Sequence, residues 1–292
     1  MAPGLTHGRA VLLMVWVTLM WSIAGVVARQ LDQARSFEVT FWRSFFTVLS
    51  LLVLLPLLRG GAVFATLRQG GRALWLSGLC WSVMFTAFMV ALTLTTVANV
   101  LITMALAPLA AALIARVFIG YRIPPRTWAA IVVAGLGIGY MYGGRFMAGH
   151  AAGTLVALAV PLATAANWTI NQRAHAWGER VDLVPAVLIG ALISAAATLP
   201  LAWPLQASLH DIGLLALLGL VQLAIPCTLA VVCARVLAAP EMSLLGLLEV
   251  VFGILLAWVG AGERPSDEAL LGGVLVIGAL VGNELIAWRG RP

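Results

Sequence analysis

Apolar stretches of about bilayer length dominate this chain and constrain its fold more than any other feature. Ten of them follow one another from Ala10 to Ala287, separated by short turns rich in arginine. A helix needs about 20 mostly apolar residues to cross a bilayer. With 62% hydrophobic and 10% charged residues, the composition is far from that of a soluble domain. We therefore predict an all-α membrane protein with ten transmembrane helices.

The first stretch resembles its neighbours more than it resembles a signal peptide. It is as long as they are, and it carries Trp16 and Trp21 instead of a plain apolar region followed by a small-residue cleavage site. The three cysteines lie inside apolar stretches, where they are interpreted as small buried hydrophobes, and no disulfide is predicted. The expected spans are residues 10–28, 39–58, 73–94, 97–119, 128–142, 153–171, 184–203, 212–237, 242–260 and 269–287.

The arginines predict an orientation. If the N-terminus is cytoplasmic, twelve of the 17 basic residues fall on the cytoplasmic side and one, Arg43, lies within a span. Basic residues near span ends are retained in the cytoplasm, so both termini are expected inside. Because these residues are scattered among short loops, the net charge of +6 does not predict nucleic-acid binding. The four on the other side are Arg29, Arg35, Arg145 and Arg264.

The chain contains an internal repeat. The segment 120–124 (GYRIP) leads into one glycine-rich span, and the segment 262–265 (GERP) leads into another. Two earlier spans carry matching polar stripes on one helical face: Thr18, Trp21, Ser22 and Gly25, and Thr164, Asn167, Trp168 and Asn171. We therefore predict two five-helix domains, residues 10–142 and 153–287. An odd number of spans per copy gives the copies opposite orientations, as in many secondary transporters.

At these residues the chain resembles the drug/metabolite transporter superfamily, in particular its ten-helix members with two EamA-type domains. The matching features are the Trp21-Ser22 pair, Arg43, Pro108, the Gly262-Glu263 turn and the glycines of the fifth and tenth spans. Within that group it looks most like exporters of aromatic amino acids. The resemblance implies export of aromatic or other apolar amino acids across a bacterial inner membrane. Two positions depart from the pattern, Tyr121 in place of a usual Glu and Glu249 near a common Pro.

Polar side chains inside the spans predict a cavity. Such groups cost free energy in hydrocarbon unless they are paired or face water. The alternative interpretation for each of them is a hydrogen bond between helices. With the two matched stripes, the polar residues that predict the lumen are Asn99, Thr103, Gln222 and Glu249.

An aromatic stripe predicts either an aromatic-walled pocket or ordinary core packing. Trp81, Phe85 and Phe88 recur at helical spacing, and Trp21 and Trp168 could complete a pocket. Ring pairs contribute about 0.5–1.5 kcal/mol beyond their buried area, enough to help select an aromatic ligand. Such a stripe more often packs in the core or against lipid.

Two charged residues are expected deep in the spans. Arg43 could grip a substrate carboxylate, since a guanidinium offers a bidentate fork, or it could tie its helix to backbone carbonyls or a neighbouring acid. Glu249 could couple transport to protons, or it could be a neutral carboxyl hydrogen-bonded in the wall. The sequence leaves both pairs of alternatives open.

Prolines and glycines predict hinges and helix packing. Pro108 and Pro226 each remove a helix hydrogen bond, so both are hinge candidates. Small residues spaced four apart let helices approach closely, and we interpret them as packing between equivalent helices of a monomer, with a dimer face as the alternative. These residues are Gly135, Gly139, Gly143, Gly278 and Gly282.

A secondary transporter for small, partly apolar metabolites, working by alternating access, is the function that these patterns favour. Direct use of ATP is excluded because a P-loop requires lysine, and the chain has none. An intramembrane enzyme is the first alternative, although all four histidines lie outside the expected spans. A non-transporting membrane scaffold is the second. No catalytic residue, cofactor, metal or nucleic-acid partner is predicted. The expected partners are an amino-acid-like small molecule and the lipid bilayer.

Overall fold

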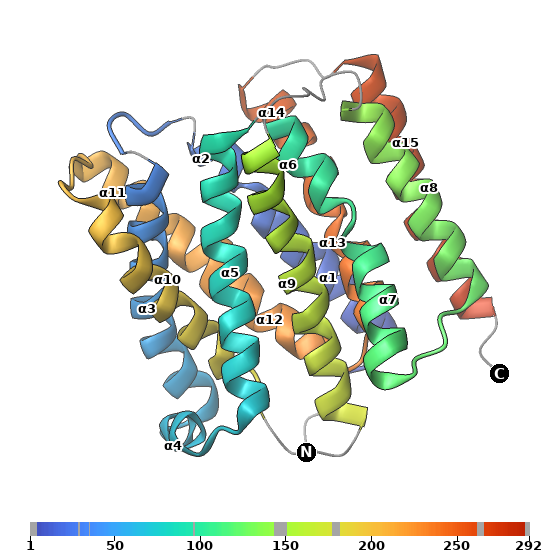
Figure 1. Cartoon of the computed structure of the whole chain (residues 1–292), viewed down its shortest axis with the longest axis horizontal. Helices are drawn as coiled ribbons and strands as arrows, with labels where there is room; N and C mark the ends of the chain where they lie inside the picture. Colours follow the sequence, from blue (N-terminus) through green and yellow to red (C-terminus); the bar gives the residue numbers. More distant parts are fainter. Residues whose placement is uncertain are drawn as a thin grey trace.

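The computed structural model describes residues 5–28, 30–34, 36–95, 97–142, 151–176, 182–261 and 266–289. Every regular element in these ranges is helical. The longer helices run side by side between the upper and lower ends of the molecule (Figure 1). The prediction of an all-α fold is therefore confirmed.

Each expected span coincides with a helix or with a run of consecutive helices. The first half contains α1 (His7–Ser22), α2 (Ala24–Ala28), α3 (Ser36–Arg59), α4 (Ala62–Gln69), α5 (Arg72–Leu94), α6 (Val97–Met104), α7 (Ala107–Ile119) and α8 (Pro125–Tyr142). The second half contains α9 (Ala151–Ala176), α10 (Pro185–Ala202), α11 (Leu209–Leu217), the π-helix η2 (Leu218–Ala224), α12 (Ile225–Cys233), α13 (Ala239–Gly246), α14 (Leu248–Ala261) and α15 (Asp267–Arg289). The short helix α4 was not expected.

Among the described residues, six helical segments are long and apolar enough to cross a membrane by length and composition. The broken segments α1–α2 and α6–α7 are not among them, and neither are α8 and α15. These six are Phe37–Leu58, Arg72–Ala91, Ala152–Ala174, Pro185–Ala202, Leu209–Cys233 and Ala239–Leu256.

Three expected spans are interrupted rather than continuous. The first breaks at Ile23, the fourth at residues 105–106, and the ninth at Leu247. The breaks between α6 and α7 and between α13 and α14 occupy corresponding positions in the two halves. Interrupted apolar helices at corresponding positions are typical of transporter binding sites, because the freed backbone groups can face a substrate.

The two hinge candidates lie at the starts of helices. Pro108 is the second residue of α7 and Pro226 the second residue of α12. Pro108 follows the break at residues 105–106, and proline costs little there because the first turn of a helix has unbonded N–H groups in any case. Pro226 lies inside the continuous helical run α11–η2–α12, where proline removes a helix hydrogen bond. Pro226 directly follows η2, whose wider turns end at Ala224. A hinge in this segment would therefore include η2 as well as the proline.

The two halves pack with corresponding partners. Helix α1 of the first half packs against α12 and α14 of the second half. Its counterpart α9 packs in the same way against α5 and α7 of the first half. Likewise α3 contacts η2, and its counterpart α10 contacts α5. Two helices also pack against their own counterparts, α3 on α10 and α8 on α15, and α7 packs on α13. Several helix pairs thus have a counterpart in the other half.

Helices α8 and α15 do pack along each other, but not through the predicted glycines. The close approach is at Gly137, where an added Cβ would lie 2.8 Å from the Gly272 carbonyl oxygen and 3.1 Å from Leu275 Cβ. Residues two apart on a helix point about 200° apart, so the predicted pair on α8 faces away from this contact. A Cβ would meet nothing within 4 Å at any of the four described glycines, Gly135, Gly139, Gly278 and Gly282.

Several predicted features lie outside the described residues. They are Gly143, the turn at 262–263, and the four arginines that define the expected outer side: Arg29, Arg35, Arg145 and Arg264. The side chain of Asn99, in α6, is also not described.

Candidate binding site

A cluster of three aromatic rings joins α5 of the first half to α9 of the second. The ring centroids of Trp81 and Phe85 are 5.5 Å apart, and those of Trp81 and Trp168 are 5.7 Å apart with planes at 86°. Edge-to-face contacts of this kind are favourable for aromatic quadrupoles. All three side chains are buried. Phe88 lies in a separate small cluster, and Trp21 joins no ring contact between described residues.

Polar groups on the same two helices, α5 and α9, are incompletely satisfied. Ser77 Oγ donates to Asn167 Oδ1 at 2.6 Å, and Asn171 Nδ2 donates to the Asn167 carbonyl at 2.8 Å. Three buried atoms have no partner among the described residues: Asn167 Nδ2, Asn171 Oδ1 and Trp81 Nε1. A buried polar group without a partner costs about 1–3 kcal/mol. These atoms are therefore suited to hydrogen bonds with a ligand or with water.

Arg43 connects the aromatic cluster to the second half. Its Nη2 donates to the Phe85 carbonyl at 3.3 Å, which matches one of the two expected roles, and its Nε has no partner among the described residues. The guanidinium also interacts electrostatically with Cys227 of α12 and Glu249 of α14. Arg43 thus ties α3 to α5 and lies within electrostatic range of α12 and α14.

The π-helix places Gln222 beside the break in α1. Gln222 Nε2 lies 3.5 Å from the Trp21 carbonyl, and its buried Oε1 has no partner among the described residues. The neighbouring Ser22 donates to the Leu19 carbonyl of its own helix at 2.7 Å, a common habit of serine within helices. Ser22 therefore offers less to a ligand than Gln222 does.

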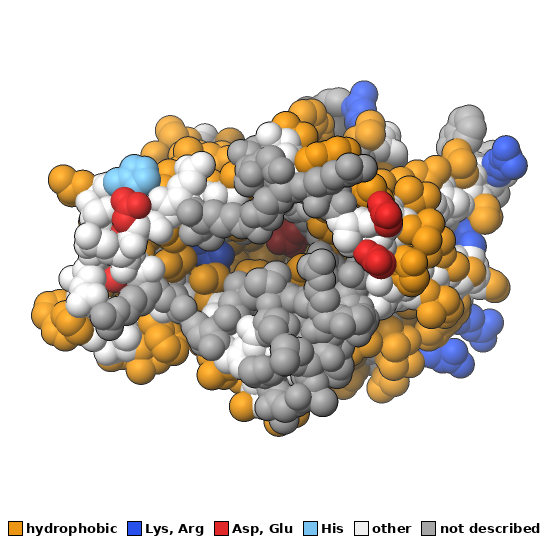
Figure 2. Space-filling view, turned by 90° about the horizontal axis from the view of Figure 1, so that it is seen from above, with side chains coloured by type: hydrophobic (Ala, Val, Ile, Leu, Met, Phe, Trp, Pro, Cys, Tyr) orange, Lys and Arg blue, Asp and Glu red, His pale blue; other side chains and the backbone are white. Residues whose placement is uncertain are grey.

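The remaining predicted site residues lie on the broken helices. Thr103 is buried in α6, and Glu249 is half-buried in the first turn of α14. Seen from above, the molecule has a hollow in which one acidic side chain is visible, with a basic side chain beside it (Figure 2). The central polar groups are thus grouped around the interrupted segments of both halves.

Two buried carboxylates that sequence reasoning missed hold α3 and α11 together. Asp211, at the start of α11, accepts backbone N–H groups of Asp32, Gln33 and Ala34, which precede α3, at 2.8 to 3.1 Å. It also accepts the Ser208 N–H at 3.2 Å. We call the carboxylates of Glu38 and Asp211, with the N–H groups that they bind, the α3–α11 clasp.

Glu38 makes the matching contacts of the clasp from the side of α3. Glu38, in the first turn of α3, accepts the N–H groups of Gln206 and Ala207, which precede α11, at 2.8 and 2.7 Å. The Ser208–Asp211 spacing is that of a capping box, and this signal could have identified α11's start from the sequence. Asp32, His210 and Asp211 offer ligand atoms within 4.8 Å of one another, but the Asp211 carboxylate is already committed to backbone, and we assign no metal there.

Comparison with known proteins identifies the family. The EamA-like transporter family matches residues 8–143 and, a second time, residues 151–283. The chain belongs to this family. It is therefore a transmembrane transporter of the drug/metabolite type rather than an enzyme, and both family domains are present in it. No curated protein sequence matches this EamA-like chain.

Solved structures resemble the transporter in fold. A crystal structure of a protein at 19% sequence identity superposes with a TM-score of 0.79 over 97% of this chain and 100% of its own. At this identity the likeness extends to the fold alone. The comparisons support the superfamily, and they do not support the closer likeness to exporters of aromatic amino acids.

Proposed function

We propose that this EamA-like protein is a secondary transporter that exports aromatic or other apolar amino acids from a bacterial cytoplasm. In this proposal ten crossings place both termini on the cytoplasmic side of the inner membrane. The two halves form an inverted repeat and expose one central site alternately to either side. The twelve arginines assigned to the cytoplasmic side support this orientation.

The observation that carries the proposal is the aromatic cluster with its unpartnered polar atoms. Trp81 and Phe85 come from the first half and Trp168 from the second, so a ligand bound there would contact both. Ring faces favour an aromatic or apolar side chain. The unpartnered Arg43 Nε and Asn167 Nδ2 are donors that suit a carboxylate.

Two features of the fold support alternating access. Several helix pairs have a counterpart in the other half, as expected for two copies that move against each other. The breaks at residues 105–106 and at Leu247 provide corresponding points at which each half can bend. The segment from η2 to Pro226 is a third candidate, since π-bulges are frequent at functional sites.

Counterflow in proteoliposomes tests the proposed transport. Purified protein would be reconstituted with unlabelled amino acid inside, and uptake of labelled phenylalanine, tryptophan, leucine, glutamate and a sugar would be compared. We expect saturable uptake of the first three only. Saturable uptake of the sugar or of glutamate alone would contradict the proposed substrate class, and uptake that does not saturate would indicate a pore.

Site variants then locate the transport site. Trp168→Ala should lower counterflow of phenylalanine more than that of leucine, because it removes one ring of the cluster. The matched control is Trp16→Ala, since Trp16 is 64% exposed on the same kind of helix. Equal losses in the two variants would contradict a substrate site at the aromatic cluster.

Proton coupling is a separate part of the proposal and concerns Glu249. Glutamine keeps the hydrogen-bonding shape of this side chain but cannot titrate. If Glu249 couples transport to protons, Glu249→Gln should abolish the response to an imposed pH gradient while counterflow persists. A variant that keeps its gradient response would assign Glu249 a structural role.

A further inference from the structure

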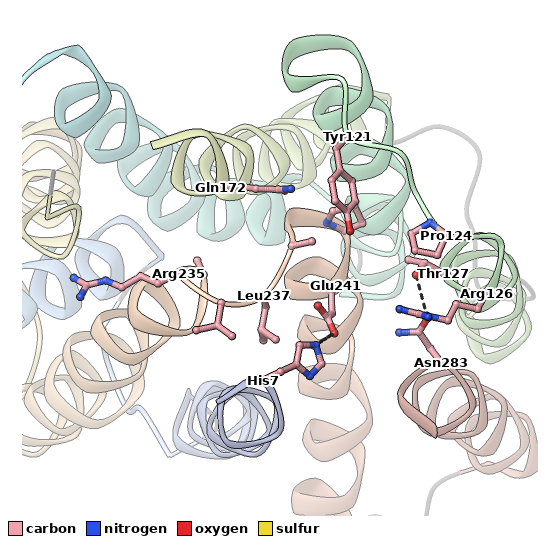
Figure 3. Close-up of a pocket in the computed structure, with 14 residues that line it drawn as sticks. His7, Tyr121, Pro124, Arg126, Thr127, Gln172, Arg235, Leu237, Glu241 and Asn283 are labelled. Carbon is pink, nitrogen blue, oxygen red and sulfur yellow. Dashed lines mark hydrogen bonds and ion pairs between the residues drawn. The ribbon is translucent and has the colours of Figure 1, made fainter. Parts of the chain in front are cut away.

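A second cavity opens at the lower end of the molecule, away from the aromatic cluster. It has a volume of about 500 Å³ and is lined by His7 of α1, the α7–α8 turn, the ends of α9 and α15, and residues 234–241. Both halves contribute to its walls (Figure 3). Ligand pockets commonly have volumes of about 300–1,000 Å³, so an amino acid would fit.

Opposite charges line this cavity. Arg126, at the start of α8, has a buried Nε without a partner, and it makes no ion pair with any described residue. Glu241, in the first turn of α13, accepts a 2.6 Å contact from His7 Nε2. The side chains of Arg126 and Glu241 extend into the cavity from different helices (Figure 3). The cavity thus presents an arginine that forms no ion pair with a described residue and a glutamate paired with His7.

Tyr121 lies between these charges. Its hydroxyl interacts electrostatically with both Glu241 and Arg126, and it points into the cavity in Figure 3. Burial raises the pKa of this hydroxyl, so it remains a hydrogen-bond donor at neutral pH. The nearby Arg235 is committed elsewhere, because it forms a 2.8 Å ion pair with Asp182.

The rest of the lining is partly rigid and partly apolar. Thr127 Oγ1 donates to Asn283 Oδ1 at 3.1 Å, which ties α8 to α15, and Gln172 Oε1 accepts the Ala239 N–H at 2.9 Å, which ties α9 to α13. Apolar side chains of the α12–α13 loop and its flanks complete the lining: Val236, Leu237, Ala238 and Pro240. An apolar surface beside two opposite charges is complementary to an apolar amino acid.

We propose that the lower cavity is a loading site for a zwitterionic apolar amino acid, separate from the aromatic cluster. Arg126 and Tyr121 bind its carboxylate, and Glu241 binds its ammonium group in exchange for His7. This inference rests on the proposed function. In the proposed orientation the cavity faces the cytoplasm, so it receives the amino acid before the central site does.

Protection of one engineered cysteine reports on this cavity alone. In a background with alanine at Cys80, Cys227 and Cys233, Ala238→Cys places a thiol in the lining. The rate at which a maleimide alkylates this thiol would be measured in nanodiscs at increasing concentrations of three ligands. They are phenylalanine, phenylalanine amide, which lacks the carboxylate, and 3-phenylpropionate, which lacks the ammonium group. Counterflow by this parent protein would be measured in parallel.

Substitutions of the charged residues should change the protecting concentration only of those ligands that carry the group bound by the substituted residue. Hydrogen bonds to charged groups contribute enough that Arg126→Gln should raise the half-protecting concentration of phenylalanine and 3-phenylpropionate about ten- to a hundredfold. It should leave the amide unchanged. Glu241→Gln should weaken protection by phenylalanine and by the amide, and it should leave protection by 3-phenylpropionate unchanged. The matched control is Arg122→Gln, an exposed arginine of the same turn that does not line the cavity.

The outcomes separate the loading site from transport itself. Counterflow without protection of the parent thiol, or equal effects of Arg126→Gln and Arg122→Gln, would overturn the loading site and leave the proposed transport intact. A parent protein that shows neither counterflow nor protection of the thiol would overturn both the loading site and the proposed transport. If Arg126→Gln does not fold, Arg126→Lys keeps the charge and should weaken only the two carboxylates, by less; equal weakening of all three ligands would overturn the assignment.

Discussion

Carboxylates hold the two halves together at both ends of the bundle, but they do so in different ways. In the α3–α11 clasp, Asp211 and Glu38 are fully buried and accept backbone N–H groups from five residues of the facing loops. At the lower end, Glu241 of α13 pairs with a side chain, that of His7 of α1, at 2.6 Å, and both side chains are partly exposed. We call this pair the α1–α13 contact.

The difference predicts which interface moves. Backbone N–H groups buried with a carboxylate lose their partners if the halves separate, so opening the clasp is costly. A partly exposed ion pair exchanges readily with water or with a ligand and contributes little. We infer that the clasp stays closed throughout the transport cycle while the α1–α13 contact opens.

The largest expected effect is that of breaking the clasp. Asp211→Ala removes the acceptor for four N–H groups and should lower the free energy of unfolding by about 3 kcal/mol. The measurement is unfolding by SDS titration in mixed micelles. Asp32→Ala is the matched control, because the Asp32 side chain is 66% exposed and only its backbone takes part in the clasp. Equal stability of the two variants would contradict the clasp.

A smaller loss is expected from crowding the neighbouring contact between α3 and η2. A Cβ at Gly219 would lie 2.6 Å from Phe46 Cβ and 2.8 Å from the Thr47 backbone nitrogen. Gly219→Ala should therefore destabilise the protein by about 1–3 kcal/mol. Gly213→Ala, in open space on α11, should be neutral or stabilising by up to about 1 kcal/mol. The same SDS titration would compare them, and a tolerated Gly219→Ala would show that this interface is looser than described.

The smallest effect on stability is expected at the α1–α13 contact. His7→Ala removes one partly exposed pair and should change the free energy of unfolding by less than about 1 kcal/mol. It should nevertheless tighten protection of Ala238→Cys by phenylalanine amide, because His7 no longer competes for Glu241. A stability loss as large as that of Asp211→Ala would remove the contrast between the two ends.

Periodicity and hydrophobicity were enough to predict the helices, because each span must satisfy its backbone hydrogen bonds internally. They also predicted that α8 and α15 pack together. They did not predict that α8 approaches α15 at Gly137. Glycines spaced four apart define one face of a helix, but the spacing does not indicate whether that face packs against a neighbouring helix. The stripe on α5 left a pocket and core packing open as alternatives; the rings of Trp81, Phe85 and Trp168 are in contact, whereas Phe88 lies in another cluster.

The clasp and the lower cavity could not be predicted in this way. Their residues lie at span ends, where polar side chains are common because they can reach water. A polar residue at such a position therefore does not indicate a site in the way that one inside a span does. Glu38 and Asp211 are 173 residues apart and become partners of facing loops only through the fold. His7 and Glu241, 234 residues apart, are likewise joined only by the packing of α1 on α13.

Spin-label distances across the two interfaces test most directly which end moves. In the cysteine-free background, one pair of labels at Gly8 and Val236 would span the lower end, and a second pair at Asp32 and Gly213 would span the clasp; all four positions are exposed. Double electron–electron resonance in nanodiscs would compare distances with and without saturating phenylalanine. We expect the lower pair to shift or broaden and the clasp pair to keep its distance. A clasp pair that shifts as much as the lower pair, or a lower pair that does not respond, would contradict the account.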